Sequence, residues 1–186
     1  MDKVIGLGKF GCSIAEHLTS YPEYRVYKID SDITERGSLS IGAHNDMQEY
    51  ENLIDDQEIT VYLRSVKTDD EVLIITEGGE PISGALLRIL STIKDAKVLY
   101  VCPDRQICSE IQKRDDKICF NIIQQYARSG AIETVYLLSK SSVEALVGDV
   151  SIQEYEKSMS YFVSYVLAMV NYFNHTKAIV SNKLSV

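Results

Sequence analysis

The chain has few of the residues that mark fibrous, disordered or disulfide-rich proteins. Only three of its 186 residues are proline and ten are glycine, which excludes a collagen-like or disordered chain. Its four cysteines, Cys12, Cys102, Cys108 and Cys119, form no CxxC pair, and no histidine is placed to complete a zinc site. We therefore expect free thiols in a reducing cytoplasm, and no metal site.

Long apolar runs and an excess of positive charge are also missing. The longest apolar run, Tyr161–Phe173, is interrupted by Ser164 and Asn171, whereas a membrane span needs about 20 residues. Asp2 and Lys3 lead directly into an apolar strand, so no signal peptide is predicted. The net charge of −8 gives no general attraction for nucleic acid or anionic lipid. We expect a soluble cytoplasmic protein with neither a nucleic-acid nor a membrane partner.

The chain is long enough to bury a core without disulfides or metals, and its apolar residues fall in a repeating order. Five short apolar runs are typical of buried parallel strands: Val4–Leu7, Arg25–Ile29, Glu71–Thr76, Lys97–Cys102 and Thr134–Leu138. Helical patterns cover Cys12–Ser20, Ser83–Lys94, about Ile107–Ser129, and Ser151 to about Lys177. This alternation predicts an α/β fold with a three-layer, doubly wound, mainly parallel Rossmann-like sheet.

Two of the segments need a closer reading. In the long C-terminal helix an apolar stripe recurs at spacings of three and four, and further apolar residues widen it, so we expect packing on two sides. The stripe is Ile152, Tyr155, Met159, Phe162, Val166, Met169 and Phe173, and the widening residues are Val163, Leu167 and Val170. The segment Met47–Lys67 has the composition of both a strand and a helix, and propensity leaves the choice open.

A glycine-rich loop follows the first predicted strand. Gly6, Gly8 and Gly11 form a GxGxxG pattern between strand and helix, where backbone N–H groups at a helix start can hold a phosphate. Lys9 lies within this loop, and Asp30 ends the second strand, where a dinucleotide-binding fold places its ribose-binding acid. The alternative is that these glycines only allow close packing.

Two more loops of small residues follow later strands. The run Gly78-Gly79-Glu80-Pro81-Ile82-Ser83-Gly84 again lies between a strand and a helix, and Ile41-Gly42-Ala43 comes before it in the chain. A dinucleotide-binding fold does not need a second glycine-rich loop at this place. Two such loops at one edge of a sheet suggest that phosphates are held from both sides.

These loops, in this order, resemble the GTP-binding domain of the FtsZ/tubulin family. Asp30-Ser31-Asp32 is similar to the family's Asn-Thr-Asp turn, Ile41-Gly42-Ala43 to its Leu-Gly-Ala, and Gly78–Gly84 to its GGGTGTG signature. The helix after Val150-Ser151 resembles the family's central helix, and the resemblance favours a helix for Met47–Lys67. It implies a nucleotide site made of Gly6, Gly8, Lys9, Gly11, Cys12, Asp30, Asp32, Gly42, Ala43, Gly78, Gly79, Ser83, Gly84 and Ser139.

The departures from the family pattern are equally informative. Glu80 puts a carboxylate where phosphate oxygens should approach, and Pro81 and Ile82 replace further glycine or small positions. Ser139 stands for the family's nucleoside-binding Asn, and its guanine-reading Asp falls near Ser160. No acid follows Glu156, so the family's catalytic loop and its activation domain are not expected, and no catalytic residue is predicted.

The resemblance implies a degenerate, shortened FtsZ/tubulin-like protein, with residues 1–186 forming one domain that ends after the central helix (about 151–177). We expect a pseudo-GTPase that binds GTP, GDP or no nucleotide, is not a competent GTPase alone, and acts in protein assembly or as an interaction scaffold. Its partner, another copy or a different protein, is expected on the C-terminal helix. The alternative is an NAD-binding regulatory domain of the RCK/KTN type, which residues 3–32 resemble equally well.

Overall fold

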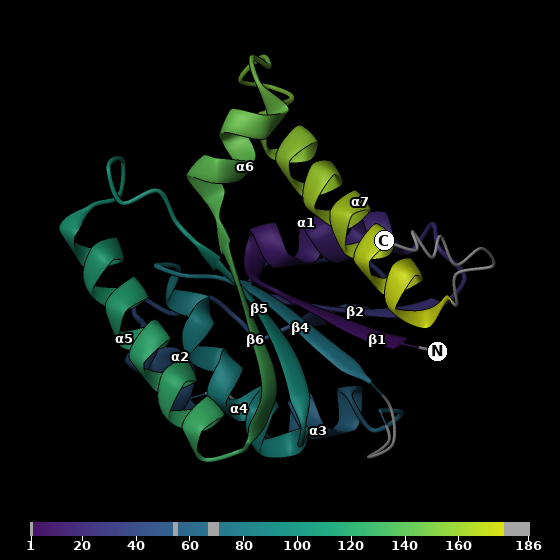
Figure 1. The fold of residues 1–186 in the computed structure, drawn as a ribbon. Coiled ribbons are helices and arrows are strands. Elements are labelled where there is room, and N and C mark those ends of the chain that lie inside the picture. The colour runs from purple at the N-terminus through teal and green to yellow at the C-terminus, as the bar shows by residue number, and fades with distance from the viewer. Residues whose placement is uncertain (1, 54–55, 67–70, 177–186) are drawn as a thin grey trace, which may run out of the picture.

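The centre of the molecule is a sheet of six parallel strands. The computed structural model describes residues 2–53, 56–66 and 71–176. In these residues the strand order is β3-β2-β1-β4-β5-β6, so the chain builds one half of the sheet and then returns past β1 to build the other (Figure 1). The strands are β1 (Asp2–Leu7), β2 (Tyr24–Asp30), β3 (Leu39–Ser40), β4 (Val72–Glu77), β5 (Ala96–Cys102) and β6 (Ile132–Ser139).

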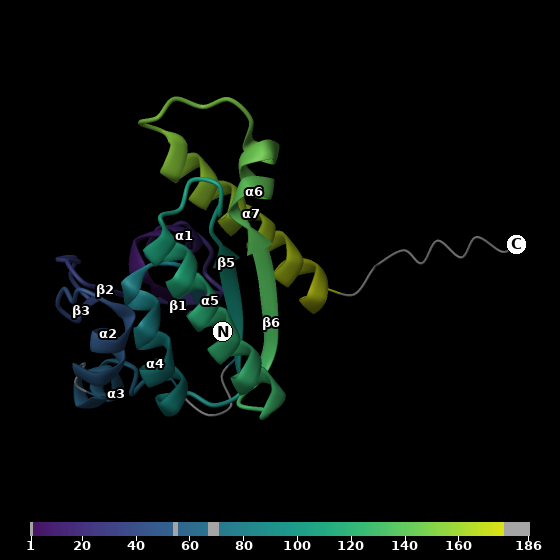
Figure 2. The ribbon, with the colours of Figure 1, turned by 90° about the vertical axis from the view of Figure 1, so that its left-hand side faces the viewer.

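Helices cover both faces of this sheet (Figures 1 and 2). One face carries α1 (Gly8–Leu18), α6 (Lys140–Val147) and α7 (Tyr155–His175). The other carries α2 (Met47–Leu53), α3 (Asp56–Tyr62), the 3-10 turn η1 (Pro81–Ala85), α4 (Leu86–Thr92) and α5 (Glu110–Arg128). None of the described helices is long and apolar enough to cross a membrane.

The central strands β1, β4 and β5 are buried on both faces, which explains why they are continuously apolar in the sequence. Ile5, Ile74 and Val98 face the layer that contains α2 to α5, whereas Val4 and Ile75 face the layer that contains α1 and α7. The edge strand β6 is more exposed. The predicted α/β class, with a doubly wound parallel sheet, is therefore confirmed.

The predicted elements agree with the observed ones except at their ends and in two short segments. All five predicted strands are present, and the described part of Met47–Lys67 is helical rather than extended. The elements β3 and α6 were not predicted, because they are short and have no clear period of their own. The last helix begins at Tyr155 rather than Ser151, and the predicted end at Lys177 lies outside the described residues.

The buried face of α7 differs from the predicted apolar stripe. Its buried residues are Met159, Ser160, Val163, Ser164 and Ala168, and this face packs against α1. Three of these five are small, and small side chains allow two helices to approach closely. The predicted stripe was wrong here because it counted only large apolar residues.

Much of that predicted stripe is solvent-exposed instead. Val166, Met169 and Phe173 are exposed, Tyr155 and Phe162 are half-buried, and Ile152 lies before the helix and is almost fully exposed. Within the described residues α7 therefore packs mainly against α1, with further contacts to α6, and its outer flank is exposed.

Candidate nucleotide-binding site

The loops that follow the parallel strands leave the sheet at one edge. Leu7 leads directly into α1, and its neighbours in the register are Ile29 of β2 and Thr76 of β4. The strand order reverses between β1 and β4, which is the place where open α/β sheets bind their ligands. The structure thus brings the first and the second glycine-rich loops together at this point.

The two loops meet at Gly8. This residue has a φ of 76°, and a Cβ added to it would lie 2.6 Å from Glu80 Oε2 and 2.9 Å from Ile82 Cγ2. The side chains of Glu80 and Ile82 therefore fill the space beside the first turn of α1. A phosphate held by the N–H groups of that turn would need the same space. In this conformation the residues present do not fit the phosphates of a nucleotide.

The Glu80 carboxyl group is held in an environment that disfavours its charge. Burial raises the pKa of Glu80 to about 7, and the negative charge of Glu77 contributes to the same direction. Lys140 and Lys9 oppose this shift through their positive charges. Among the described residues the Glu80 carboxyl group has no hydrogen-bonding or ion-pair partner. Its ionisation therefore changes near neutral pH.

An ion pair beside this carboxyl group joins β4 to the start of α6. Lys140 Nζ lies 2.6 Å from Glu77 Oε1 and 4.5 Å from the centre of the Phe10 ring. The Glu77 side chain is 9% exposed and that of Lys140 is 20% exposed, so water screens the pair only weakly. Neither residue stood out in the sequence, because the only signal is position: Glu77 ends β4 and Lys140 directly follows β6.

Several of the predicted site glycines are required by close packing. A Cβ at Gly6 would lie 2.5 Å from the carbonyl oxygen of Gly11, and a Cβ at Gly11 would collide with the carbonyl oxygen of Ile75. A Cβ at Gly84 would collide with the backbone of Met47, at the start of α2. These three glycines let helices approach strands and other helices closely. This agrees with the packing alternative for Gly6 and Gly11.

The second glycine loop rests on a polar network that the sequence did not indicate. The Tyr100 hydroxyl donates to Asp116 Oδ1 at 2.7 Å, and Arg105 donates to Asp116 Oδ2 through Nε at 3.0 Å and Nη2 at 2.7 Å. A Cβ at Gly78 would collide with both Tyr100 and Asp116, and one at Gly79 would lie 3.0 Å from the Gln112 carbonyl oxygen. The loop is thus held by β5 and α5.

Lys9 in the first loop and Asp30 at the end of β2 lie near Glu80 but are directed to other partners. Lys9 Nζ lies 2.9 Å from Glu156 Oε2 in the first turn of α7, and this hydrogen bond raises the pKa of Lys9. Asp30 ends β2, where its Oδ1 accepts a hydrogen bond from the Ser31 amide at 2.8 Å, and burial raises the pKa of Asp30. Asp32 is exposed.

Cys12 is buried beneath the first loop. Its Sγ lies 3.3 Å from the Gly6 carbonyl oxygen and 3.4 Å from that of Ile29. Burial raises the pKa of Cys12 to about 12, so the group remains a thiol at neutral pH. These contacts give Cys12 a structural role between β1 and β2.

The remaining predicted residues fall into two groups. Gly42 and Ala43 are exposed, and a Cβ at Gly42 would meet no atom within 4 Å. Ser83 and Ser139 bond to backbone instead: the Ser83 hydroxyl donates to the Glu80 carbonyl oxygen at 2.7 Å, and the Ser139 hydroxyl accepts from the Ser142 amide and caps α6.

Ser160, which occupies the position expected for a guanine-reading acid, is buried between α7 and α1. The Ser13 hydroxyl donates to Ser160 Oγ at 2.8 Å, and the Ser160 hydroxyl donates to the Lys157 carbonyl oxygen at 3.1 Å. Its hydroxyl group is therefore engaged by the helix packing.

Comparison with known proteins gives a match in structure but none in sequence. No protein-family model and no curated protein matches this chain. A solved structure titled as an empty FtsZ dimer from M. jannaschii superposes with a TM-score of 0.73 at 11% sequence identity. The match covers 98% of this chain and 57% of the FtsZ chain, so this chain spans somewhat more than half the length of that protein. Nothing in these comparisons supports the NAD-binding alternative. The chain therefore has an FtsZ/tubulin-like fold.

Proposed function

We propose that residues 1–186 form one FtsZ/tubulin-like domain that acts in protein assembly or as an interaction scaffold, and that it is not a competent GTPase by itself. The position of Glu80 is the observation that carries this proposal. Its carboxyl group and the Ile82 side chain lie against Gly8, where a nucleotide phosphate would otherwise approach the start of α1.

A carboxylate in this position opposes nucleotide binding in two ways. It occupies volume, and when ionised it repels phosphate oxygens at short range by about 1–4 kcal/mol. A nucleoside di- or triphosphate, GTP or GDP on the pattern of the fold, could enter only if Glu80 moved or took up a proton. In our proposal the domain is closed to nucleotide at neutral pH, and its role is carried by its surfaces.

The exposed flank of α7 is the surface that best fits a protein partner. Large apolar side chains project from it: Tyr165 is 49% exposed, Met169 41% and Phe173 66%. Beside it lies a groove of about 600 Å³ between α7, α6 and the strands β5 and β6, lined by Leu99, Leu138, Val143, Val163, Val166 and Val170. Contiguous apolar surface of this kind marks interaction sites on proteins. We therefore assign the flank of α7 to contact with another copy or a different protein.

Light scattering of the purified chain tests this assignment. We expect the wild-type chain to associate in a concentration-dependent way, and Tyr165→Glu or Met169→Glu to reduce the association, because each places a charge in the apolar flank. Lys157→Gln, at an exposed position of the same helix, changes the net charge by the same amount and should leave association unchanged. A wild-type monomer at every concentration, with both glutamate variants badly destabilised, would show that the flank is ordinary core.

A further inference from the structure

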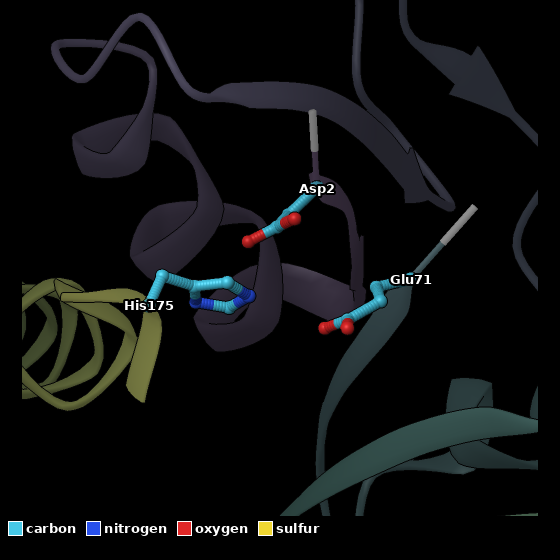
Figure 3. A group of neighbouring side chains, drawn as sticks. All are labelled: Asp2, Glu71 and His175. Carbon is cyan, nitrogen blue, oxygen red and sulfur yellow. The ribbon is translucent and has the colours of Figure 1, made fainter. Parts of the chain in front are cut away.

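Three possible metal ligands from distant parts of the chain converge at the edge of the sheet opposite the glycine loops. Asp2 begins β1, Glu71 immediately precedes β4, and His175 ends α7 (Figure 3). One ligand atom from each side chain lies within 4.8 Å of the other two. Figure 3 shows the His175 ring turned towards the two carboxylates. No metal site was predicted from the sequence, because these residues share no local motif.

Asn171 contacts two of these three residues. Its side-chain amide donates to Asp2 Oδ2 at 2.8 Å, and its backbone carbonyl oxygen lies 3.0 Å from His175 Nδ1. A carbonyl oxygen can only accept, so Nδ1 carries the proton and Nε2 offers its lone pair. Histidine ligands of metals are commonly oriented in this way, by a hydrogen bond from the second ring nitrogen to a carbonyl group. The backbone carbonyl group of Asn171 therefore orients the imidazole, and the Asn171 side chain holds one carboxylate beside it.

A lysine of β5 holds one oxygen of the Glu71 carboxyl group. Lys97 Nζ lies 3.0 Å from Glu71 Oε2. This contact uses one carboxylate oxygen, so the other can bind an ion.

We propose that Asp2, Glu71 and His175 bind one zinc ion. A mixed set of one imidazole and two carboxylates suits zinc, whereas Mg²⁺ and Ca²⁺ prefer oxygen ligands alone. Two ligand atoms of a tetrahedral zinc lie about 3.3 Å apart, since each bond is about 2.0 Å. Glu71 and His175 are exposed, so rotation of their side chains can close the remaining gap. The ion would join the last turn of α7 to the starts of β1 and β4.

Calorimetric titration of the tag-free, EDTA-treated chain with zinc chloride tests the site. The wild-type chain should bind zinc with a stoichiometry of one, and magnesium should not compete. His175→Ala and Glu71→Gln should abolish this binding or weaken it by at least about ten-fold. Asn171→Ala should weaken it by about 10–100-fold, because it removes the hydrogen bond that positions the Asp2 carboxylate. Asn174→Ala and His44→Ala, which lie outside the three ligands, are the matched controls and should bind zinc as the wild type does.

Two further readouts separate this site from adventitious binding by the cysteines. X-ray absorption spectroscopy at the zinc edge should find only nitrogen and oxygen atoms bonded to the zinc. Zinc should also raise the melting temperature of the wild type but not that of His175→Ala. All the substituted ligands are at or near the surface, so circular dichroism should confirm that the variants fold. Absence of zinc binding, binding that survives in His175→Ala, or sulfur in the first shell would each overturn the proposal.

Discussion

The contribution of Glu80 to the stability of the folded chain depends on pH. Burial raises its pKa in the folded chain from 4.5 to about 7, so the folded state binds more protons than the unfolded state between these two values. The stability contributed by the protonated group is fully present below pH 4.5 and is lost as the pH rises through 7. The charged carboxylate is thus destabilising at pH 8, by about 2–3 kcal/mol.

Glu80→Gln should remove this dependence, because an amide of similar size does not ionise. We expect the variant to be more stable than the wild type at pH 8, by about 1–3 kcal/mol, and no more stable at pH 4.5. Urea unfolding at the two pH values measures both differences. Equal stabilisation at both would mean that the ionisation of Glu80 is not the cause.

At the scale of secondary-structure elements, the Glu77–Lys140 ion pair connects β4 with α6 across the candidate site. Removal of one partner leaves the other charge largely buried and unpaired, so we expect Lys140→Met to destabilise the chain by about 2–3 kcal/mol. Glu77→Gln combined with Lys140→Met should cost less than the sum of the two single changes. Denaturant unfolding of the wild type, the two single variants and the double variant gives the coupling free energy of the pair directly.

The exposed Lys9–Glu156 pair is the matched control for that cycle, because it also joins two elements of the same face. Both of its side chains are well exposed to water, so Lys9→Met should cost less than about 1 kcal/mol. If the two pairs contributed equally, burial would not be what gives the Glu77–Lys140 pair its strength.

The elements that could be predicted from the sequence are those with a strong period or a continuous apolar run. The strands β1, β4 and β5 are of this kind, because burial on both faces demands apolar residues throughout. The buried face of α7 could not be read in this way. It includes Ser160, Ser164 and Ala168, whose small side chains allow a close approach to α1 but add little to an apolar pattern.

The candidate site was predictable in its loops but not in its contacts. Both loops could be located from the glycines between strand and helix. Glu80 in the second loop could be recognised as a departure from the glycine-rich family pattern. The direction of the Glu80 side chain, towards Gly8, depends on how the loops face each other across β1 and β4. The Tyr100–Asp116–Arg105 network and the Asp2–Glu71–His175 cluster depend on the same long-range geometry, for which a single sequence has no local signal.

At the scale of the whole molecule, two surfaces differ in character. The carboxyl edge carries two glycine loops closed on each other by Glu80 and Ile82, and the α7 face carries an apolar flank and groove. In this arrangement the apolar flank of α7 is open to a partner, whereas the candidate nucleotide position beside Gly8 is occupied by side chains. The central claim is that Glu80 keeps that position closed.

Calorimetric titration with GTP and GDP in the presence of magnesium, at pH 8, tests this claim most directly. The wild-type chain should bind neither nucleotide measurably and should release no phosphate from GTP above background. Glu80→Gly should gain binding, because the backbone at this position is extended and tolerates any residue, and Glu80→Gln should lie between the two because it removes charge but not volume. Stoichiometric nucleotide binding by the wild type that Glu80→Gly leaves unchanged or weakens, or GTP turnover of about 1 per second, would contradict the account.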